Sequence, residues 1–155
     1  AYALGLLKLS LITFFIIMPY RMFSGGFHLH THIGCIISTC TFYCGVAFLS
    51  EIILLNDITK YVLILCVAIF GIVMIKLYAP ADTEDVPILS SKIRKQKQIL
   101  SYVTFIIGLI LALFIKDSVI CNIIIFGYFA QTCMITRLAY KLTKNKYGYE
   151  VYENA

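Results

Sequence analysis

Long apolar blocks constrain this chain more than any other feature. Four of them are close in length to the about 20 residues that a helix needs to cross a bilayer. They cover residues 34–50, 61–78, 99–115 and 118–136. A fifth block, 2–19, is long enough but contains Lys8, whose side chain can reach the nearer interface. No strand-like alternation competes, and only helices and closed barrels satisfy backbone groups in lipid. The sequence therefore predicts an all-α membrane bundle with five membrane segments.

Composition agrees with this class. Hydrophobic residues make up 61% of the 155 residues and charged residues 14%, whereas an ordinary soluble domain is about half apolar and about a quarter charged. The six cysteines include no C-x-x-C pair, so no disulfide framework is expected. The chain begins at Ala1 with an apolar block. We therefore expect one integral membrane domain over residues 1–155, with an N-terminal part missing.

The distribution of basic residues predicts how the bundle is oriented. Only Lys60 and Lys116 fall in connections on one side of the predicted membrane. The connections on the other side carry Arg21, Lys76, Lys92, Arg94, Lys95, Lys97, Arg137, Lys141, Lys144 and Lys146. Lysine and arginine accumulate in cytoplasmic loops, so the second side is predicted to face the cytoplasm.

The chemistry-bearing residues gather in one run, residues 20–35, with the sequence YRMFSGGFHLHTHIGC. It contains a glycine pair followed by His28, His30, His32 and Cys35. On one continuous helix His30 would point away from the other three, and His28 and Cys35 would lie about 10 Å apart along the axis. His28 can reach the thiol only if the chain bends between them, and Gly25, Gly26 and Gly34 allow such a bend. A cysteine in the first turn of the following helix would sit at the positive end of the helix dipole, which favours the attacking thiolate.

Three interpretations of this cluster stay open on spacing alone. The histidines can be interfacial residues, with Cys35 a packing residue. His28, His32 and Cys35 can instead form a zinc site, with water, Asp82 or Glu84 as a fourth ligand, in a metal-binding membrane protein such as a transporter subunit. In the third interpretation Cys35 and one histidine form a nucleophile and its base.

Two motifs resemble those of a known family. The run RMFSGGFHLHTHIGC is similar to the accessory gene regulator B (AgrB) peptidases of Gram-positive quorum sensing, in which a basic residue and a Gly-rich turn precede a histidine and a cysteine with six residues between them. His28 and Cys35 fit that spacing, and His30 and His32 do not. The segment LYAPADTEDVPI, residues 77–88, resembles a second family motif, and the basic run KIRKQK, residues 92–97, follows it.

The resemblance implies a cysteine endopeptidase of the bacterial cell membrane, multi-pass, with an active site that faces the cytoplasm. Cys35 would be the nucleophile and His28 the base. The substrate would be a small AgrD-type propeptide, which is cut and cyclised to a thiolactone or lactone autoinducing peptide. The resemblance implies no cofactor. Membrane lipid is a further expected partner and nucleic acid is not, and a homo-oligomer is left open.

We expect simpler roles for the remaining polar segments. Thr31, Ser38, Asp82 and Glu84 are candidates for a group that orients His28. The acidic residues 82–85 are expected to cap a span and keep their loop solvated, and the basic residues 92–97 to contact anionic lipid. Residues 137–155 are predicted to form a cytoplasmic tail.

Overall fold

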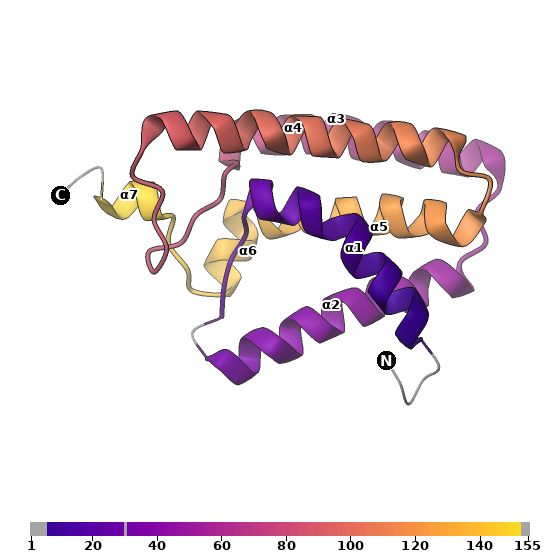
Figure 1. Ribbon diagram of the computed structural model, residues 1–155, viewed down its shortest axis with the longest axis horizontal. Helices are drawn as coiled ribbons and strands as arrows, with labels where there is room; N and C mark the ends of the chain where they lie inside the picture. The colour runs from indigo at the N-terminus through magenta and orange to yellow at the C-terminus, as the bar shows by residue number, and fades with distance from the viewer. Residues whose placement is uncertain (1–5, 30, 153–155) are drawn as a thin grey trace.

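The computed structural model describes residues 6–29 and 31–152. In this part of the chain it contains no named strand (Figure 1). Its helices are α1 (Leu7–Ser24), α2 (His32–Ile52), α3 (Asp57–Tyr78), α4 (Ser91–Phe114), α5 (Ser118–Met134), α6 (Arg137–Leu142) and α7 (Gly148–Tyr152). The all-α prediction is confirmed.

Helices α1 to α4 are each long and apolar enough to cross a membrane, and α5 is a shorter apolar helix. In each of the four, only 22–28% of the most apolar stretch is buried inside the protein. The outward surface is therefore mostly apolar, with side chains such as Leu65, Ile69 and Ile106 exposed. A surface of this kind is solvated by lipid chains, and the protein is a multi-pass helical membrane bundle.

Helix α5 lies at the centre of the bundle and packs against α1, α2, α3 and α4. A ring cluster joins three of these helices: the Tyr20 ring lies 5.2 Å from both Phe105 and Tyr128, between ring centroids. The Tyr20 hydroxyl also shares a 3.0 Å hydrogen bond with Thr132. These contacts fix α1 and α4 against the central helix.

The predicted hairpin of the last two spans is present. A short connection joins α4 to α5, the two helices are in contact, and Asp117 caps α5 by accepting a 3.0 Å hydrogen bond from the Ile120 amide. The largest differences from the predicted boundaries are in α1 and α4. α1 continues through Pro19 to Ser24, because a proline is tolerated in a membrane helix. α4 begins at Ser91, because the Lys-, Arg- and Gln-rich run favours a helix and Ser90 caps it.

One end of the bundle collects the segments that carry the two sequence motifs. Figure 1 shows that α1 ends, α2 begins, α3 ends and α4 begins at this end, where α6 and α7 also lie. The segments predicted to face the cytoplasm therefore meet at one end. At the opposite end, the Lys60 ammonium donates a 3.3 Å hydrogen bond to the Ile115 carbonyl.

Candidate functional site

His28 and Cys35 lie close together because α2 begins between them. His28 is on the connection that follows α1, and Cys35 is in the first turn of α2. The Cys35 Sγ lies 3.9 Å from His28 Nδ1, within reach of a weak thiol–imidazole hydrogen bond. The bend that this contact needs between the two residues is therefore present, and the thiol has an imidazole beside it.

The start of α2 is fixed by Thr31. Its Oγ1 accepts a 3.1 Å hydrogen bond from the Gly34 amide, and its carbonyl accepts a 2.9 Å hydrogen bond from the Cys35 amide. A Cβ on Gly34 would come within 2.6 Å of Thr31 Oγ1, so a glycine leaves room for this cap. The Thr31 hydroxyl, one of the candidates for orienting His28, is thus used to fix the turn that carries Cys35.

The surroundings of His28 favour its neutral form. Partial desolvation lowers the pKa of His28, the cationic Arg21 lowers it further, and Asp85 opposes this shift. An imidazole with a pKa below its ordinary value is mostly unprotonated at neutral pH. It can therefore accept a proton from a neighbouring thiol.

His28, His32 and Cys35 do not form a metal site in the structure. Among the described residues, no group of three or more His, Cys, Asp and Glu side chains is placed to hold a metal ion. His32 is the first residue of α2 and is exposed, whereas His28 is off the helix, so the face these residues were expected to share is broken. His30 lies outside the described residues.

The two sequence motifs are joined by backbone hydrogen bonds. The Ala81 amide donates to the Ser24 carbonyl at 2.8 Å, and the Gly26 amide donates to the Ala81 carbonyl at 2.9 Å. Gly25 lies between them with a φ of 75°, and a Cβ there would overlap the Ala81 carbonyl oxygen. The glycine pair therefore does more than allow the chain to bend, because it also admits the 79–88 loop beside the His28 connection.

A buried glutamine, which the sequence did not mark as functional, also donates hydrogen bonds to this connection. Gln131, on α5, is fully buried; its Nε2 donates to the Gly25 carbonyl at 2.8 Å and to the Ser24 Oγ at 3.1 Å. Its Oε1 accepts a 3.1 Å hydrogen bond from Arg21. A lone glutamine inside an apolar span was the available signal, because polar groups in such segments seldom lack partners.

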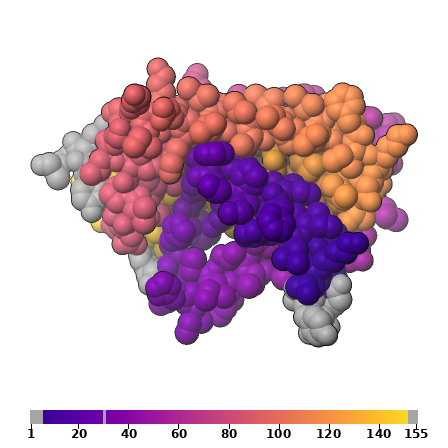
Figure 2. All heavy atoms as spheres, viewed as in Figure 1, coloured from indigo at the N-terminus to yellow at the C-terminus, as the bar shows by residue number. Residues whose placement is uncertain are grey.

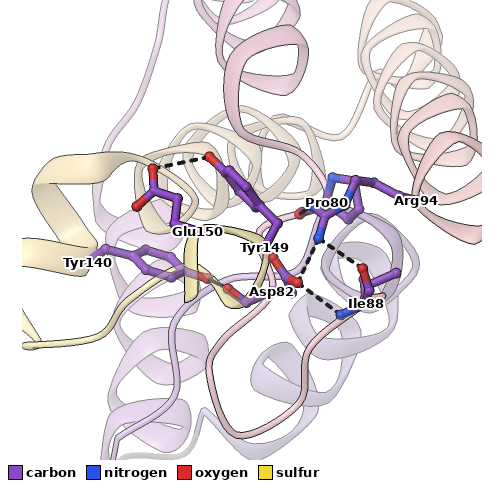
Figure 3. Close-up of polar contacts among 7 residues, drawn as sticks. All are labelled: Pro80, Asp82, Ile88, Arg94, Tyr140, Tyr149 and Glu150. Carbon is purple, nitrogen blue, oxygen red and sulfur yellow. Dashed lines mark hydrogen bonds and ion pairs between the residues drawn. The ribbon is translucent and has the colours of Figure 1, made fainter. Parts of the chain in front are cut away.

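Asp82 is buried, and the prediction of a solvated acidic loop is wrong at this position. Its side chain is 1% exposed, and Oδ2 accepts hydrogen bonds from Arg94 at 2.7 Å and from the Ile88 amide at 2.9 Å (Figure 3). Arg94 also donates to the Pro80 and Ile88 carbonyls. Arg94 is therefore not a free cation facing lipid, because the carboxylate pairs with it across the loop. The Asp82 Oδ2 is thus used by Arg94 and the Ile88 amide.

The segment after α5, which the sequence predicted only as a cytoplasmic tail, folds against the loop. The Tyr140 hydroxyl donates to the Asp82 carbonyl at 3.1 Å, and the Tyr147 hydroxyl donates to the Ile135 carbonyl at 2.8 Å. The two rings stack with centroids 4.0 Å apart. Burial raises the pKa of both phenols, so they stay protonated and act as donors.

A cavity of about 410 Å³ opens beside His28. It lies between α1, α2 and the 79–88 loop, and Figure 2 shows the molecule hollowed between α1 and α2. Apolar side chains such as Phe14, Met18 and Val86 line it, together with the cationic Arg21 and Lys97. Cys35 borders a smaller adjoining space that shares Arg21 with this cavity. The cavity can therefore hold an apolar chain that carries negative charge.

Together, the fold and this end of the bundle define a multi-pass helical membrane protein with a cysteine–histidine pair beside an open cavity. Residues 1–135 match the family model for accessory gene regulator B, and the chain belongs to this family.

Curated relatives agree over nearly the whole chain. An AgrB-like protein of Listeria innocua is 28% identical over 154 residues, which cover 99% of this chain and 74% of the relative. An AgrB-like protein of Listeria monocytogenes is 27% identical, with coverage of 99% and 74%. One from Clostridium acetobutylicum is 24% identical, with coverage of 95% and 68%. No solved structure matches the chain significantly.

Proposed function

We propose that this protein is a membrane-embedded cysteine endopeptidase that cleaves a small AgrD-type propeptide and promotes its cyclisation for quorum sensing. The observation that carries the proposal is the 3.9 Å approach of Cys35 Sγ to His28 Nδ1 at the start of α2. Membership of the accessory gene regulator B family supports it. The accumulation of basic residues at this end of the bundle supports a site that faces the cytoplasm.

In the first half of the proposed reaction, His28 accepts the proton of the Cys35 thiol as the sulfur attacks the scissile carbonyl. The tetrahedral intermediate then collapses and the peptide C–N bond breaks. His28 returns its proton to the leaving amine, which departs with the C-terminal part of the propeptide. The N-terminal part stays attached to Cys35 as a thioester.

The second half exchanges one thioester for another. A cysteine thiol inside the bound propeptide attacks the acyl carbonyl, its proton passes through His28 to the departing Cys35 sulfur, and a thiolactone ring is released. A propeptide serine would give a lactone by the same route. Exchange between thioesters is close to balanced in energy, so placement of the propeptide cysteine and release of the cleaved tail must favour the ring.

The start of α2 offers donors for the developing oxyanion. The first N–H groups of a helix have no intrahelical carbonyl within reach, and anions are stabilised at this end of the helix. The amides of His32 and Ile33 are of this kind, whereas those of Gly34 and Cys35 donate to Thr31. We therefore assign the oxyanion to the first two amides.

The cavity beside His28 suits the rest of the propeptide. Its apolar lining would hold the apolar face of an amphipathic peptide, and Arg21 and Lys97 would attract acidic residues. The cavity contacts His28 directly, so a peptide bound there would lie next to the reacting pair.

Co-expression with the cognate propeptide tests the proposal. Wild-type protein should yield the shortened, cyclised peptide by mass spectrometry, and Cys35→Ala or His28→Ala should abolish it. His32→Ala is the matched control and should keep most of the activity, because His32 is exposed and lies outside the reacting pair. Full processing by Cys35→Ala would contradict the proposal. Zinc in the purified protein that is lost in His32→Ala would favour the metal-site interpretation instead.

A further inference from the structure

One residue of the C-terminal tail touches the connection that carries His28. Asn145 is buried, and its Nδ2 donates a 2.8 Å hydrogen bond to the backbone carbonyl of His28, 117 residues away in sequence. The same nitrogen lies 3.3 Å from the Thr143 carbonyl and 2.9 Å from Thr143 Oγ1. The Asn145 amide group is thus surrounded by acceptor oxygens.

The chain around Asn145 is held on both sides. Before it, Lys144 adopts a φ of 57° and reverses the chain, so the backbone N–H of Asn145 donates to the Tyr140 carbonyl at 2.9 Å. After it, Gly148 packs so closely on the 79–88 loop that a Cβ there would come within 2.7 Å of Asp82 Oδ2.

Tyr149 adds a further contact with α4. Its ring centroid lies 4.7 Å from the Arg94 guanidinium carbon, and Figure 3 shows Tyr149 beside the Asp82–Arg94 pair. Asn145 is therefore carried by a backbone that is fixed against α6 and the loop, and it presents its amide to His28 from a defined position.

The chemistry of these contacts requires an amide at this position. The Asn145 Nδ2 carries two hydrogens and lies within hydrogen-bond distance of three oxygens, so it can donate to the His28 carbonyl and to Thr143 at the same time. An aspartate has nearly the same shape but would place a carboxylate oxygen against them. It would repel the His28 carbonyl instead of holding it, and would leave a charge in a buried position.

We propose that Asn145 is a positioning residue, which fixes the backbone of His28 so that its imidazole faces Cys35. The tail thereby contributes to the reaction, although the matched family model ends at residue 135. This inference rests on the proposed function, in which His28 is the proton acceptor. Ala81 and Gln131 restrain this connection at Gly26 and Gly25, whereas Asn145 restrains it at His28 itself, and the 3.9 Å approach to Cys35 depends on that placement.

The first test measures cleavage by the full chain in proteoliposomes with a synthetic propeptide. Asn145→Asp should lower kcat on the order of 10- to 100-fold, the effect of displacing a catalytic group by about 1 Å, with KM nearly unchanged. Tyr147→Phe is the matched control: it removes a buried hydrogen bond from the same tail, to Ile135, and should stay close to wild type. Equal kcat losses in both variants, or a wild-type rate in Asn145→Asp, would overturn the proposal.

The second test needs no propeptide. Iodoacetamide alkylation of Cys35 is followed by mass spectrometry across pH 5–9 in detergent-solubilised protein. A thiol coupled to an imidazole gives a profile that His28→Ala changes. The Asn145→Asp profile should resemble that of His28→Ala, and the Tyr147→Phe profile that of wild type. A wild-type profile in Asn145→Asp would overturn the proposal even if the peptidase assignment failed on its own test.

Folding is monitored in the same alkylation experiment, from the cysteines that mass spectrometry finds modified. Cys121 on α5 is 1% exposed and should stay unmodified in any folded variant. If Asn145→Asp exposes Cys121, then Asn145→Ala, which adds no charge, replaces it in both measurements. Exposure of Cys121 in both variants would make Asn145 a folding residue and would overturn the proposal.

Discussion

The Gly26 amide donates a 2.9 Å hydrogen bond to the Ala81 carbonyl, and this bond joins the two segments that resembled a family in the sequence. Gly26 lies two residues before His28, so the position of the proposed base depends on the 79–88 loop. That loop depends in turn on the Asp82–Arg94 pair and on the tail. The connection that carries His28, the 79–88 loop, the start of α4 and the tail therefore form one connected unit.

Gly25→Ala should destabilise the protein and reduce cleavage. The new Cβ would overlap the Ala81 carbonyl at a φ of 75°, which should cost about 1–3 kcal/mol of unfolding free energy. Gly45→Ala is the control, because a Cβ at that position in α2 meets nothing within 4 Å. Thermal unfolding in detergent compares the two. A Gly25→Ala protein as stable and active as Gly45→Ala would contradict the role given to the Gly25–Ala81 contact.

Thr31→Ala should reduce cleavage more than its effect on stability explains. It removes the cap of α2, worth about 1 kcal/mol, and loosens the turn that holds Cys35. Asn56→Ala removes an equivalent cap from α3, where Asn56 Oδ1 accepts from the Thr59 amide at 2.8 Å, away from the site. Thr31→Ser should restore activity. Equal activity losses in Thr31→Ala and Asn56→Ala would show that only general stability matters.

The acid limb of the pH–rate profile should report the protonation of the His28 imidazole. Because desolvation and Arg21 lower its pKa below 6.5, activity should persist at neutral pH and fall only as acid protonates the imidazole. Arg21→Gln removes the nearby positive charge, so it should move this limb to higher pH, whereas Arg21→Lys should not. Measuring kcat/KM from pH 5 to 8 tests this. A limb that stays in place in Arg21→Gln would contradict the effect assigned to Arg21.

Arg94→Met should destabilise the loop strongly. It leaves the buried Asp82 carboxylate without its cation, which should cost about 2–3 kcal/mol, less than for a fully buried pair because Arg94 is partly exposed. Lys95→Met makes the same kind of change at the next, exposed position and should have little effect on stability. Unfolding in detergent distinguishes them. Similar melting temperatures would show that the Asp82–Arg94 pair contributes little.

The sequence was sufficient for the features that depend on local pattern. Apolar length predicted the spans, the short 116–117 link predicted the last hairpin, and the glycines allowed His28 to reach Cys35. Helix limits at polar ends were less predictable, because a cap such as Ser90 competes with the loop character of the residues around it.

Contacts between distant residues could not be predicted from spacing. From the sequence, Asp82 and Arg94 were both predicted to be solvated charges. Only the folded loop shows that they pair. Gln131 lies in an apolar span and Asn145 in a basic tail, and no periodic pattern marks either residue. Each acquires its partner from a segment more than 100 residues earlier in the chain.

The hydrogen bond between Asn145 and His28 also sets an order of events during biosynthesis. The ribosome adds Asn145 117 residues after His28, when α1 to α6 have already been made. While the chain is still growing, the thiol and the imidazole are present without the tail that holds the His28 backbone. In the proposed mechanism the site is therefore complete only after residue 145 has been added and has folded back onto the connection that carries His28.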